Sequence, residues 1–153
     1  MSDLYASWKD LDYCTSEGDS IRRCVMPKRV ESYEDLIAWQ KSMDVAVEVF
    51  SLSNKGRIAR NFAFCDQLQR AASSVPSNIA EGFERGSRAE FHRFLSISKA
   101  SCAELRTRLQ LAIRVGYLEA ASASAIIDRA AEVGRIIGRL RKTVAAQRDA
   151  SRA

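Results

Sequence analysis

The chain of 153 residues contains little of what metal, redox and catalytic sites are commonly built from. It has one histidine, His92, and four cysteines, Cys14, Cys24, Cys65 and Cys102, and none of them lies at the spacing of a zinc site. Two prolines and seven glycines are too few for the many turns of a small β-protein and favour a few long helices. We therefore expect no metal, no cofactor, and reduced thiols in a cytoplasmic protein.

Motifs of nucleotide-binding, hydrolytic and di-iron proteins are also missing. The chain has no P-loop, no GxGxxG and no GxSxG, and its carboxylates do not form the ExxH pairs of a di-iron bundle. No apolar run approaches the ~20 residues of a membrane-spanning helix. The N-terminus, MSDLYASWKDLDYC, is too acidic and polar for a signal peptide. These absences predict a protein that is not an enzyme and has no membrane segment.

Helical periodicity begins after an N-terminal extension, residues 1–30, that has no sustained pattern and that we expect to be poorly ordered. Ser32 and Asp35 resemble a capping box. Apolar residues then recur at three and four positions in two stripes, Leu36, Trp39, Met43, Val47 and Phe50, and Ile37, Val45, Val49 and Leu52. The spacing predicts a first helix that ends near Leu52, where SNKGR supplies turn residues.

Three further helices follow from the same kind of pattern. The second runs from about Asn61–Phe64 to Glu84, with Phe64, Leu68, Ala71, Val75, Ile79 and Phe83 on its inner face. The third begins at the capping box Ser87–Glu90 and carries the heptad Phe91, Leu95, Ser98, Cys102, Leu105, Leu109, Ala112. The fourth begins near Ser122 and carries Ile126, Ala130, Val133, Ile137, Leu140 and Val144. Gly134 and Gly138 predict close packing of this helix on a neighbour.

Four helices joined by short loops predict an all-α fold, an antiparallel up-down-up-down four-helix bundle over residues 31–147 with a short tail at 148–153. The first and third helices each carry a second apolar stripe, although a lone bundle needs one seam per helix. This surplus favours self-association, and the alternative is that the core-facing stripes are simply wide.

Pro76 lies in the middle of the second helix and predicts a kink there, because its ring crowds the carbonyl of Ala72. Polar side chains lie near the same level of the bundle. One interpretation is a buried polar network that fixes helix register, formed by Arg70, Asn78, Glu81, Glu104 and Arg108. The other is a ligand or nucleic-acid contact at the kink.

Positive charge increases towards the C-terminus. The net charge is +5, and residues 122–153 hold seven bases against three acids. Arg135, Arg139 and Lys142 share one face of the fourth helix with Arg141 beside them, which predicts a polyanion surface. The alternative is favourable placement of cations at a helix C-terminus. Because no aromatic stacking surface is expected among the exposed residues, we expect contacts to phosphates rather than bases. The next candidate residues lie in the loops: Arg57, Arg60, Arg85 and Arg88.

Three segments carry a family resemblance: SYEDLIAWQKSMDVAVEVF, LQRAASSVPSNIAEGFERGSRAEFHRFLSISKASCAEL and LAIRVGYL. Over roughly Val30 to Val144 the chain resembles the four-helix bundle family named after the 23S rRNA intervening-sequence protein. The long run around VPSNIAEG and FHRFLSIS makes the resemblance specific. The acidic N-terminal extension and the arginine-rich last helix depart from the family pattern.

The resemblance implies a ring-like homopentamer and a role in binding nucleic acid, with no catalytic residues to transfer. A relative of that family, the accessory variability determinant of diversity-generating retroelements, implies an alternative: an accessory subunit that binds a reverse transcriptase and its template RNA. From the sequence we therefore predict a non-catalytic, homo-oligomeric nucleic-acid-binding protein whose partner is most simply RNA, with the reverse-transcriptase accessory role as the alternative.

Overall fold

The structure, a computed structural model, describes the backbone of residues 30–150 and the side chains of residues 30–147. The predicted N-terminal extension therefore lies outside the described residues, except for Val30, which is buried against the bundle. The side chains of the predicted tail also lie outside them, while the backbone of the last helix continues to Ala150.

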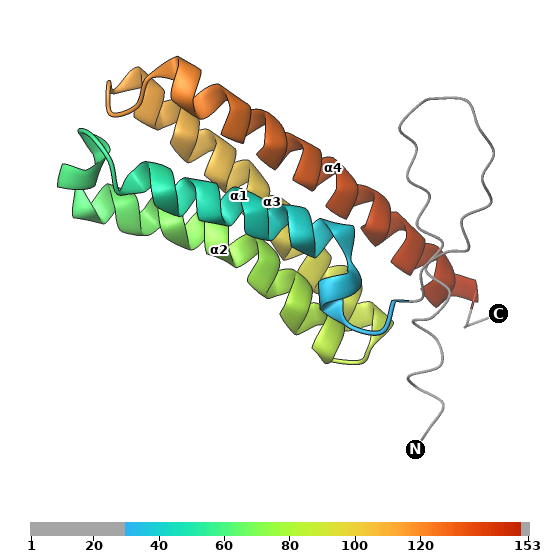
Figure 1. Ribbon diagram of the computed structural model, residues 1–153. Coiled ribbons are helices and arrows are strands. Elements are labelled where there is room, and N and C mark those ends of the chain that lie inside the picture. Colours follow the sequence, from blue (N-terminus) through green and yellow to red (C-terminus); the bar gives the residue numbers. More distant parts are fainter. Residues whose placement is uncertain (1–29, 151–153) are drawn as a thin grey trace.

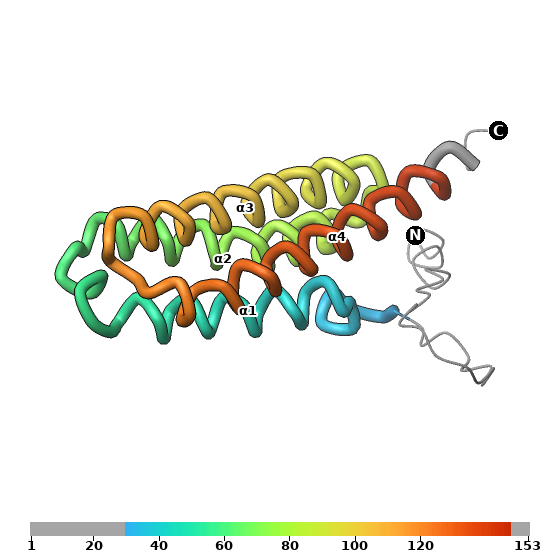
Figure 2. The backbone as a smooth tube through the Cα atoms, turned by 90° about the horizontal axis from the view of Figure 1, so that it is seen from above, coloured from blue at the N-terminus to red at the C-terminus, as the bar shows by residue number. Residues whose placement is uncertain are grey.

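Four α-helices form the described part of the chain, and they are arranged up-down-up-down around one core (Figure 1). Helix α1 spans Ile37–Ser53, α2 Phe62–Glu84, α3 Arg88–Arg114 and α4 Ala120–Ala150. Short 3-10 turns precede α1, at Tyr33–Asp35, and α2, at Ile58–Arg60. Each helix packs on its neighbours in sequence, and α4 closes the bundle against α1 (Figure 2). The predicted all-α fold and its helix order are confirmed.

The chain reverses at three short connections, and each contains a glycine with positive φ: Gly56, Gly86 and Gly116. Side-chain caps fix some of the helix starts. Asp35 accepts a hydrogen bond from the backbone N–H of Ser32, and Asn61 accepts one from Phe64 N at the start of α2. Ser87 occupies the predicted N-cap of α3 but makes no side-chain cap hydrogen bond, so the capping box expected there is wrong.

The core is made by the seams that the sequence predicts on α2, α3 and α4. Every residue of the α3 heptad is at most 3% exposed, and every residue of the α4 seam at most 5%. On α2 the predicted inner face is buried from Leu68 to Phe83, and Phe64 is half-buried. Heptad spacing suits helices that cross at shallow angles, as they do in bundles. Such helices stay in contact along their length, so a single apolar seam on each helix is enough to build the core.

The buried face of α1 contains Val45 and Val49 from the second of the two predicted stripes. It consists mostly of small residues: Ala38, Ser42, Val45, Ala46, Val49 and Ser53. Of the more conspicuous apolar stripe, Met43, Val47 and Phe50 are 37%, 60% and 40% exposed. Small side chains let α1 approach its neighbours closely. The serines fit because Ser42 and Ser53 donate hydrogen bonds to the carbonyls of Trp39 and Phe50.

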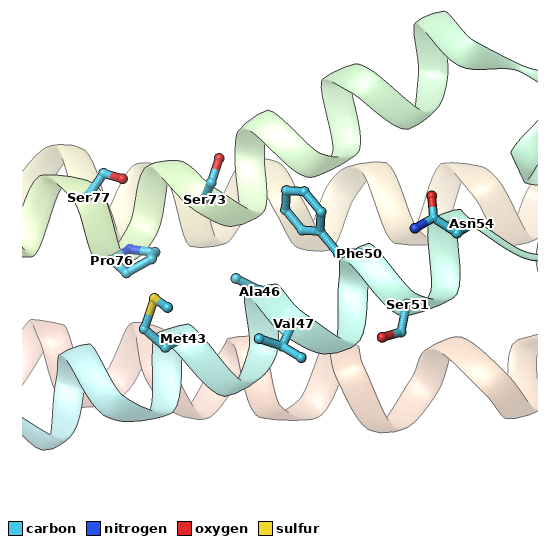
Figure 3. Close-up of a pocket in the computed structure, with 9 residues that line it drawn as sticks. All are labelled: Met43, Ala46, Val47, Phe50, Ser51, Asn54, Ser73, Pro76 and Ser77. Carbon is cyan, nitrogen blue, oxygen red and sulfur yellow. The ribbon is translucent and has the colours of Figure 1, made fainter.

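Pro76 is buried inside a continuous α2, and Figure 3 shows the helix axis changing direction at the level of Ser73 and Pro76. Hydroxyl groups join α2 to α3 at the same level. Ser74 Oγ lies 2.9 Å from Ser101 Oγ, and Ser98 Oγ donates to the carbonyl of Val75 at 2.8 Å. The second helix thus carries its proline where α3 supplies hydrogen-bonding side chains.

Candidate nucleic-acid interface

Many cations of the described bundle already have carboxylate partners. Lys41 pairs with Glu132, Arg70 with Asp66, Arg108 with Glu104, and Arg129 with Glu48, while Arg85 and Arg93 pair with acids around the α2–α3 connection. Apart from Arg88, whose guanidinium donates to the carbonyl of Gln147, the cations of residues 30–147 that have no carboxylate within 4.0 Å fall into two groups. Only these can bring uncompensated positive charge to a polyanion.

The first group, the cationic side surface, lies along α3 and α4 and consists of Lys99, Arg106, Arg135, Arg139, Arg141 and Lys142. Arg135, Arg139 and Lys142 are exposed, as expected for one outward face of α4. Arg141 is half-buried and donates to Ser96 Oγ on α3 at 3.1 Å. The structure thus brings the four predicted α4 residues together and anchors one of them to α3.

Two members of this surface, Lys99 and Arg106, were missed by sequence reasoning. They lie seven residues apart, on the side of α3 that faces α4. Lys99 Nζ is 3.5 Å from the position that a Cβ on Gly138 would occupy, so its ammonium group reaches the α4 backbone between Arg135 and Lys142. The sequence did contain a sign of this contact, because the glycine at position 138 leaves room for a long side chain from a neighbouring helix.

No acid lies between Phe91 and Ala103 on α3, or between Val133 and Gln147 on α4. The Glu132 carboxylate just before that stretch of α4 is bonded to Lys41 on α1. Because charges of one sign are not neutralised locally, their potentials add over this face and attract anions.

The second group, the end cluster, consists of Lys55, Arg57 and Arg60 from the α1–α2 connection, Arg114 at the end of α3, and the neighbouring aromatic residue Phe62. The α1–α2 and α3–α4 connections lie at the same end of the bundle (Figure 1). Arg57 Nη1 lies 4.0 Å from the Cβ position of Gly116, and Asn61 Nδ2 donates to Tyr117 Oη at 3.0 Å. Two of the predicted loop arginines, Arg57 and Arg60, therefore lie here.

The other two loop arginines are engaged within the protein. Arg85 donates to Glu81 at 2.6 Å, and its guanidinium lies 5.0 Å from the centre of the Phe94 ring. Arg88, at the first turn of α3, donates to the carbonyl of Gln147 near the end of α4. We therefore separate Arg85 and Arg88 from the residues that the structure presents to a polyanion.

The predicted buried polar network is wrong in its membership. Arg70 and Glu81 are exposed and pair with Asp66 and Arg85. Arg108 pairs with Glu104 on α3 and donates to Gln67, two turns before Ser74 on the same side of α2. Of the predicted members only Asn78 belongs to the contacts at the kink, where its amide donates to the Ser74 carbonyl and hydroxyl. The residues at that place are Ser74, Asn78, Ser98 and Ser101, and each finds its partner within the bundle.

An apolar groove of about 460 Å³ runs between α1 and α2 (Figure 3). It is lined by Met43, Ala46, Val47, Phe50, Ser51, Asn54, Ser73, Pro76 and Ser77. A second exposed stripe lies on α3, with apolar residues at Ile97, Leu111 and Val115 and the Glu104–Arg108 ion pair between them. The predicted second stripes thus exist, and on α1 the exposed one is the stripe that the sequence pattern assigned first.

The described part of the chain contains neither a metal site nor a membrane-spanning helix. It contains no group of three or more histidine, cysteine or acidic residues placed to hold a metal ion. None of its helices combines the length and the apolar character needed to cross a bilayer. Cys65 and Cys102 are buried free thiols. Burial raises the pKa of the Cys102 thiol to about 12, which keeps it protonated and unreactive.

The fold and its surfaces define a helical bundle whose distinguishing external features are unpaired cations and exposed apolar stripes. The family model of the 23S rRNA-intervening sequence protein matches residues 34–139, and the chain belongs to that family. A crystal structure of a protein of unknown function from the S23 ribosomal protein family of Bacteroides thetaiotaomicron has the same fold. It matches with a TM-score of 0.63 and 24% identity, over 69% of this chain and 99% of that one. A comparison with curated proteins finds no match.

Proposed function

We propose that the chain is a non-catalytic, homo-oligomeric protein that binds nucleic acid, most simply RNA, through its cationic side surface. The observation that carries the proposal is the set of cations on α3 and α4 that have no carboxylate partner in the described bundle. Membership in the 23S rRNA-intervening sequence protein family supports it by association. A cytoplasmic location accords with this function.

The arrangement of the cations suits a phosphate backbone. Arg135 and Lys142 are separated by about 10 Å along the axis of α4, and Lys99 and Arg106 by a similar rise along α3. Interaxial distances of 8–10 Å in packed helices bring these two rows side by side, and the Lys99 ammonium group lies over Gly138 between them. No aromatic residue occurs in α4. Such a surface binds by neutralising phosphates and releasing counterions, without specifying sequence.

The test is to replace Arg135, Arg139 and Lys142 by Gln and to measure RNA affinity at several salt concentrations. We expect weaker binding with little dependence on RNA sequence. The slope of log affinity against log salt should fall by roughly 0.7 for each single-strand phosphate contact removed. All three side chains are exposed, so thermal unfolding should be unchanged.

A matched control replaces Arg70, Arg93 and Arg108 by Gln, which removes the same charge from cations that already have carboxylate partners. Its effect on RNA affinity should be much smaller. Equal losses in both variants would show that only net charge matters. A parent protein that binds no RNA at low salt contradicts the proposal, and an α4 variant that binds like the parent favours a protein partner such as a reverse transcriptase.

The exposed apolar stripes support assembly of identical copies. The α1 stripe, Met43, Val47 and Phe50, and the α3 stripe, Ile97, Leu111 and Val115, are different surfaces of one chain. Contact between two different surfaces of identical subunits is head-to-tail, and it produces a ring when the rotation closes. A homopentamer is the ring that the family resemblance implies, and a ring would repeat the cationic side surface in every subunit.

A further inference from the structure

Phe62 is 83% exposed, the largest exposure among the large apolar side chains of the described residues. Sequence reasoning anticipated no exposed aromatic surface, and this residue contradicts it. Its position explains the exposure, since Phe62 is the first residue of α2 and precedes the apolar seam that begins with Phe64 and Leu68. An isolated exposed apolar side chain is ordinary. Its surroundings make this one informative.

The cations of the end cluster lie in or beside the two connections at this end of the bundle. Arg60 lies two residues before it, Arg57 belongs to the same connection, and Arg114 ends α3 beside Gly116. None of them, nor Lys55, has a carboxylate within 4.0 Å among the described residues. The acids nearby are Asp66, which pairs with Arg70, and the exposed Glu119 in the facing connection. The end of the bundle thus combines one aromatic face with a net positive charge.

Hydrogen bonds and ring packing hold this end of the bundle together. The Asn61 side chain caps α2 through Phe64 N and also donates to the Tyr117 hydroxyl. The rings of Phe64 and Tyr117 pack edge to face with centroids 5.6 Å apart. Asn61 therefore joins the two connections and fixes the backbone from which the Phe62 side chain projects. A side chain held on rigid elements loses less freedom on binding than one on a mobile loop.

We propose that the end cluster binds unpaired nucleotides of RNA, with a base stacked on Phe62 and neighbouring phosphates held by the cations of the same connection, Arg57 and Arg60. Aromatic side chains combined with cations are how proteins hold single-stranded nucleic acid without reading its sequence. The inference rests on the proposed function and adds a preference to it. The side surface holds any phosphate backbone, and the end cluster selects strands whose bases are free to stack.

The experiment compares a single-stranded oligoadenylate of about 12 nucleotides, within the usual site size of such proteins, with a blunt RNA duplex of similar length. The proteins are the parent chain, Phe62→Ala, Phe62→Leu and Phe62→Trp. The Ala and Leu variants should bind the oligoadenylate about 5- to 100-fold more weakly, the range that loss of one base stack produces. Their affinity for the duplex should equal that of the parent.

Phe62→Trp supplies a direct signal of stacking. It should keep the parent's affinity for the oligoadenylate, and its added fluorescence, taken as the difference from the parent, should be quenched by the oligoadenylate and not by the duplex. Phe62→Leu separates stacking from apolar contact, because leucine keeps the apolar surface and has no π-face. A Leu variant that binds like the parent overturns the inference, as does an unquenched Trp variant.

Two further outcomes also overturn it. If Phe62→Ala leaves oligoadenylate binding intact but lowers the assembly mass in light scattering, Phe62 is a contact between copies. If it abolishes binding to phosphatidylglycerol vesicles alone, the cluster docks on an anionic membrane. If the variant with Gln at positions 135, 139 and 142 loses RNA affinity while the Phe62 variants keep it, this inference fails and the proposed function stands. A parent that binds neither probe contradicts both proposals.

Discussion

Gly82 is the residue at which α2 and α3 approach most closely among the glycines of the bundle. A Cβ at this position would lie 2.5 Å from Phe94 Cβ and 3.2 Å from Phe91 Cδ2, and the first of these atoms cannot move without its backbone. Gly134 and Gly138, which the sequence pattern marks for close packing, would meet their nearest neighbours at 3.7 and 3.5 Å, which is ordinary contact. The glycine that fixes interhelical distance is therefore Gly82.

We expect Gly82→Ala to destabilise the bundle by about 1–3 kcal/mol, the usual effect of overpacking, because α2 and α3 must separate. The matched control is Gly138→Ala. There the nearest atom is the end of the flexible Lys99 side chain, and alanine is favoured over glycine in a helix by up to about 1 kcal/mol. Urea unfolding of the two variants should shift in opposite directions, and equal shifts would contradict the assignment.

Cys102 gives the bundle a specific response to high pH. Burial raises the pKa of its thiol from the ordinary 9.0 to about 12, an effect that the nearby Arg106 reduces. Below the ordinary pKa the thiol is neutral in both the folded and unfolded chain and contributes no pH dependence. Between the two values only the unfolded chain loses the proton, so stability falls with rising pH, by at most about 1.4 kcal/mol per pH unit.

The free energy of unfolding of the parent should therefore fall more steeply between about pH 9 and pH 11 than that of Cys102→Ala. Other groups titrate in the same range, but they are shared by the two proteins and cancel in the comparison of slopes. Parallel slopes would show that the Cys102 thiol ionises in the folded protein.

At the scale of elements, α2, α3 and α4 could be placed from the sequence because their seams are made of large apolar residues at regular spacing. α1 could not be assigned its buried face in this way. Its inward residues include Ser42 and Ser53, and its exposed residues include Val47 and Phe50, so hydrophobicity alone does not distinguish the two sides. The two serine hydroxyls can be buried because they donate to backbone carbonyls of the same helix, and these hydrogen bonds form only when the helix is folded.

In the candidate surfaces too, residues placed by spacing along one helix could be predicted, and residues placed by the packing of two helices could not. Arg135, Arg139 and Lys142 were predictable, because one helix face is defined by spacing along a single element. Lys99 and Arg106 depend on which side of α3 meets α4. Phe62 was missed because its exposure depends on where α2 starts, and helix boundaries are the least determined feature of a sequence pattern. Arg85 and Arg88 appeared free in the sequence, and their partners come from tertiary packing.

Pro76 allows a prediction about the second helix as an element. Replacing it by Ala restores a backbone donor and favours the helix by up to ~3 kcal/mol, but it also removes a buried ring that lines the apolar groove. We expect these effects to offset each other in monomer stability and the altered groove to weaken assembly. Urea unfolding and light scattering measure the two separately. A variant that melts and assembles like the parent would show that the kink is incidental.

At the scale of the whole molecule, the two exposed stripes predict how assembly fails. Val47→Asp or Ile97→Asp should each prevent ring formation while leaving the bundle folded, because the two side chains are 60% and 40% exposed and neither belongs to the buried core. Light scattering should give a mass near the 17.1 kDa of one chain for either variant, and several times that for the parent. Gln110→Asp, at an exposed polar position of α3, is the control and should assemble normally.

Mixing the two variants distinguishes head-to-tail assembly from a symmetric dimer. Each variant keeps one intact stripe, and the two intact stripes are complementary if α1 of one copy contacts α3 of the next. An equimolar mixture should therefore form pairs that cannot grow further. A mixture that stays monomeric contradicts a contact between these stripes, and a parent that is itself monomeric at micromolar concentration contradicts assembly.

The three short connections also have a consequence in time. Apart from the closure of α4 on α1, each helix packs mainly on the one before or after it in the chain, so most contacts are local in sequence. Chains of this kind fold in microseconds to milliseconds, whereas the joining of subunits is bimolecular and slower at low concentration. A newly made copy therefore completes its own bundle first and meets its partners as a folded body with both stripes uncovered. The interval between the two events lengthens as the protein becomes scarcer.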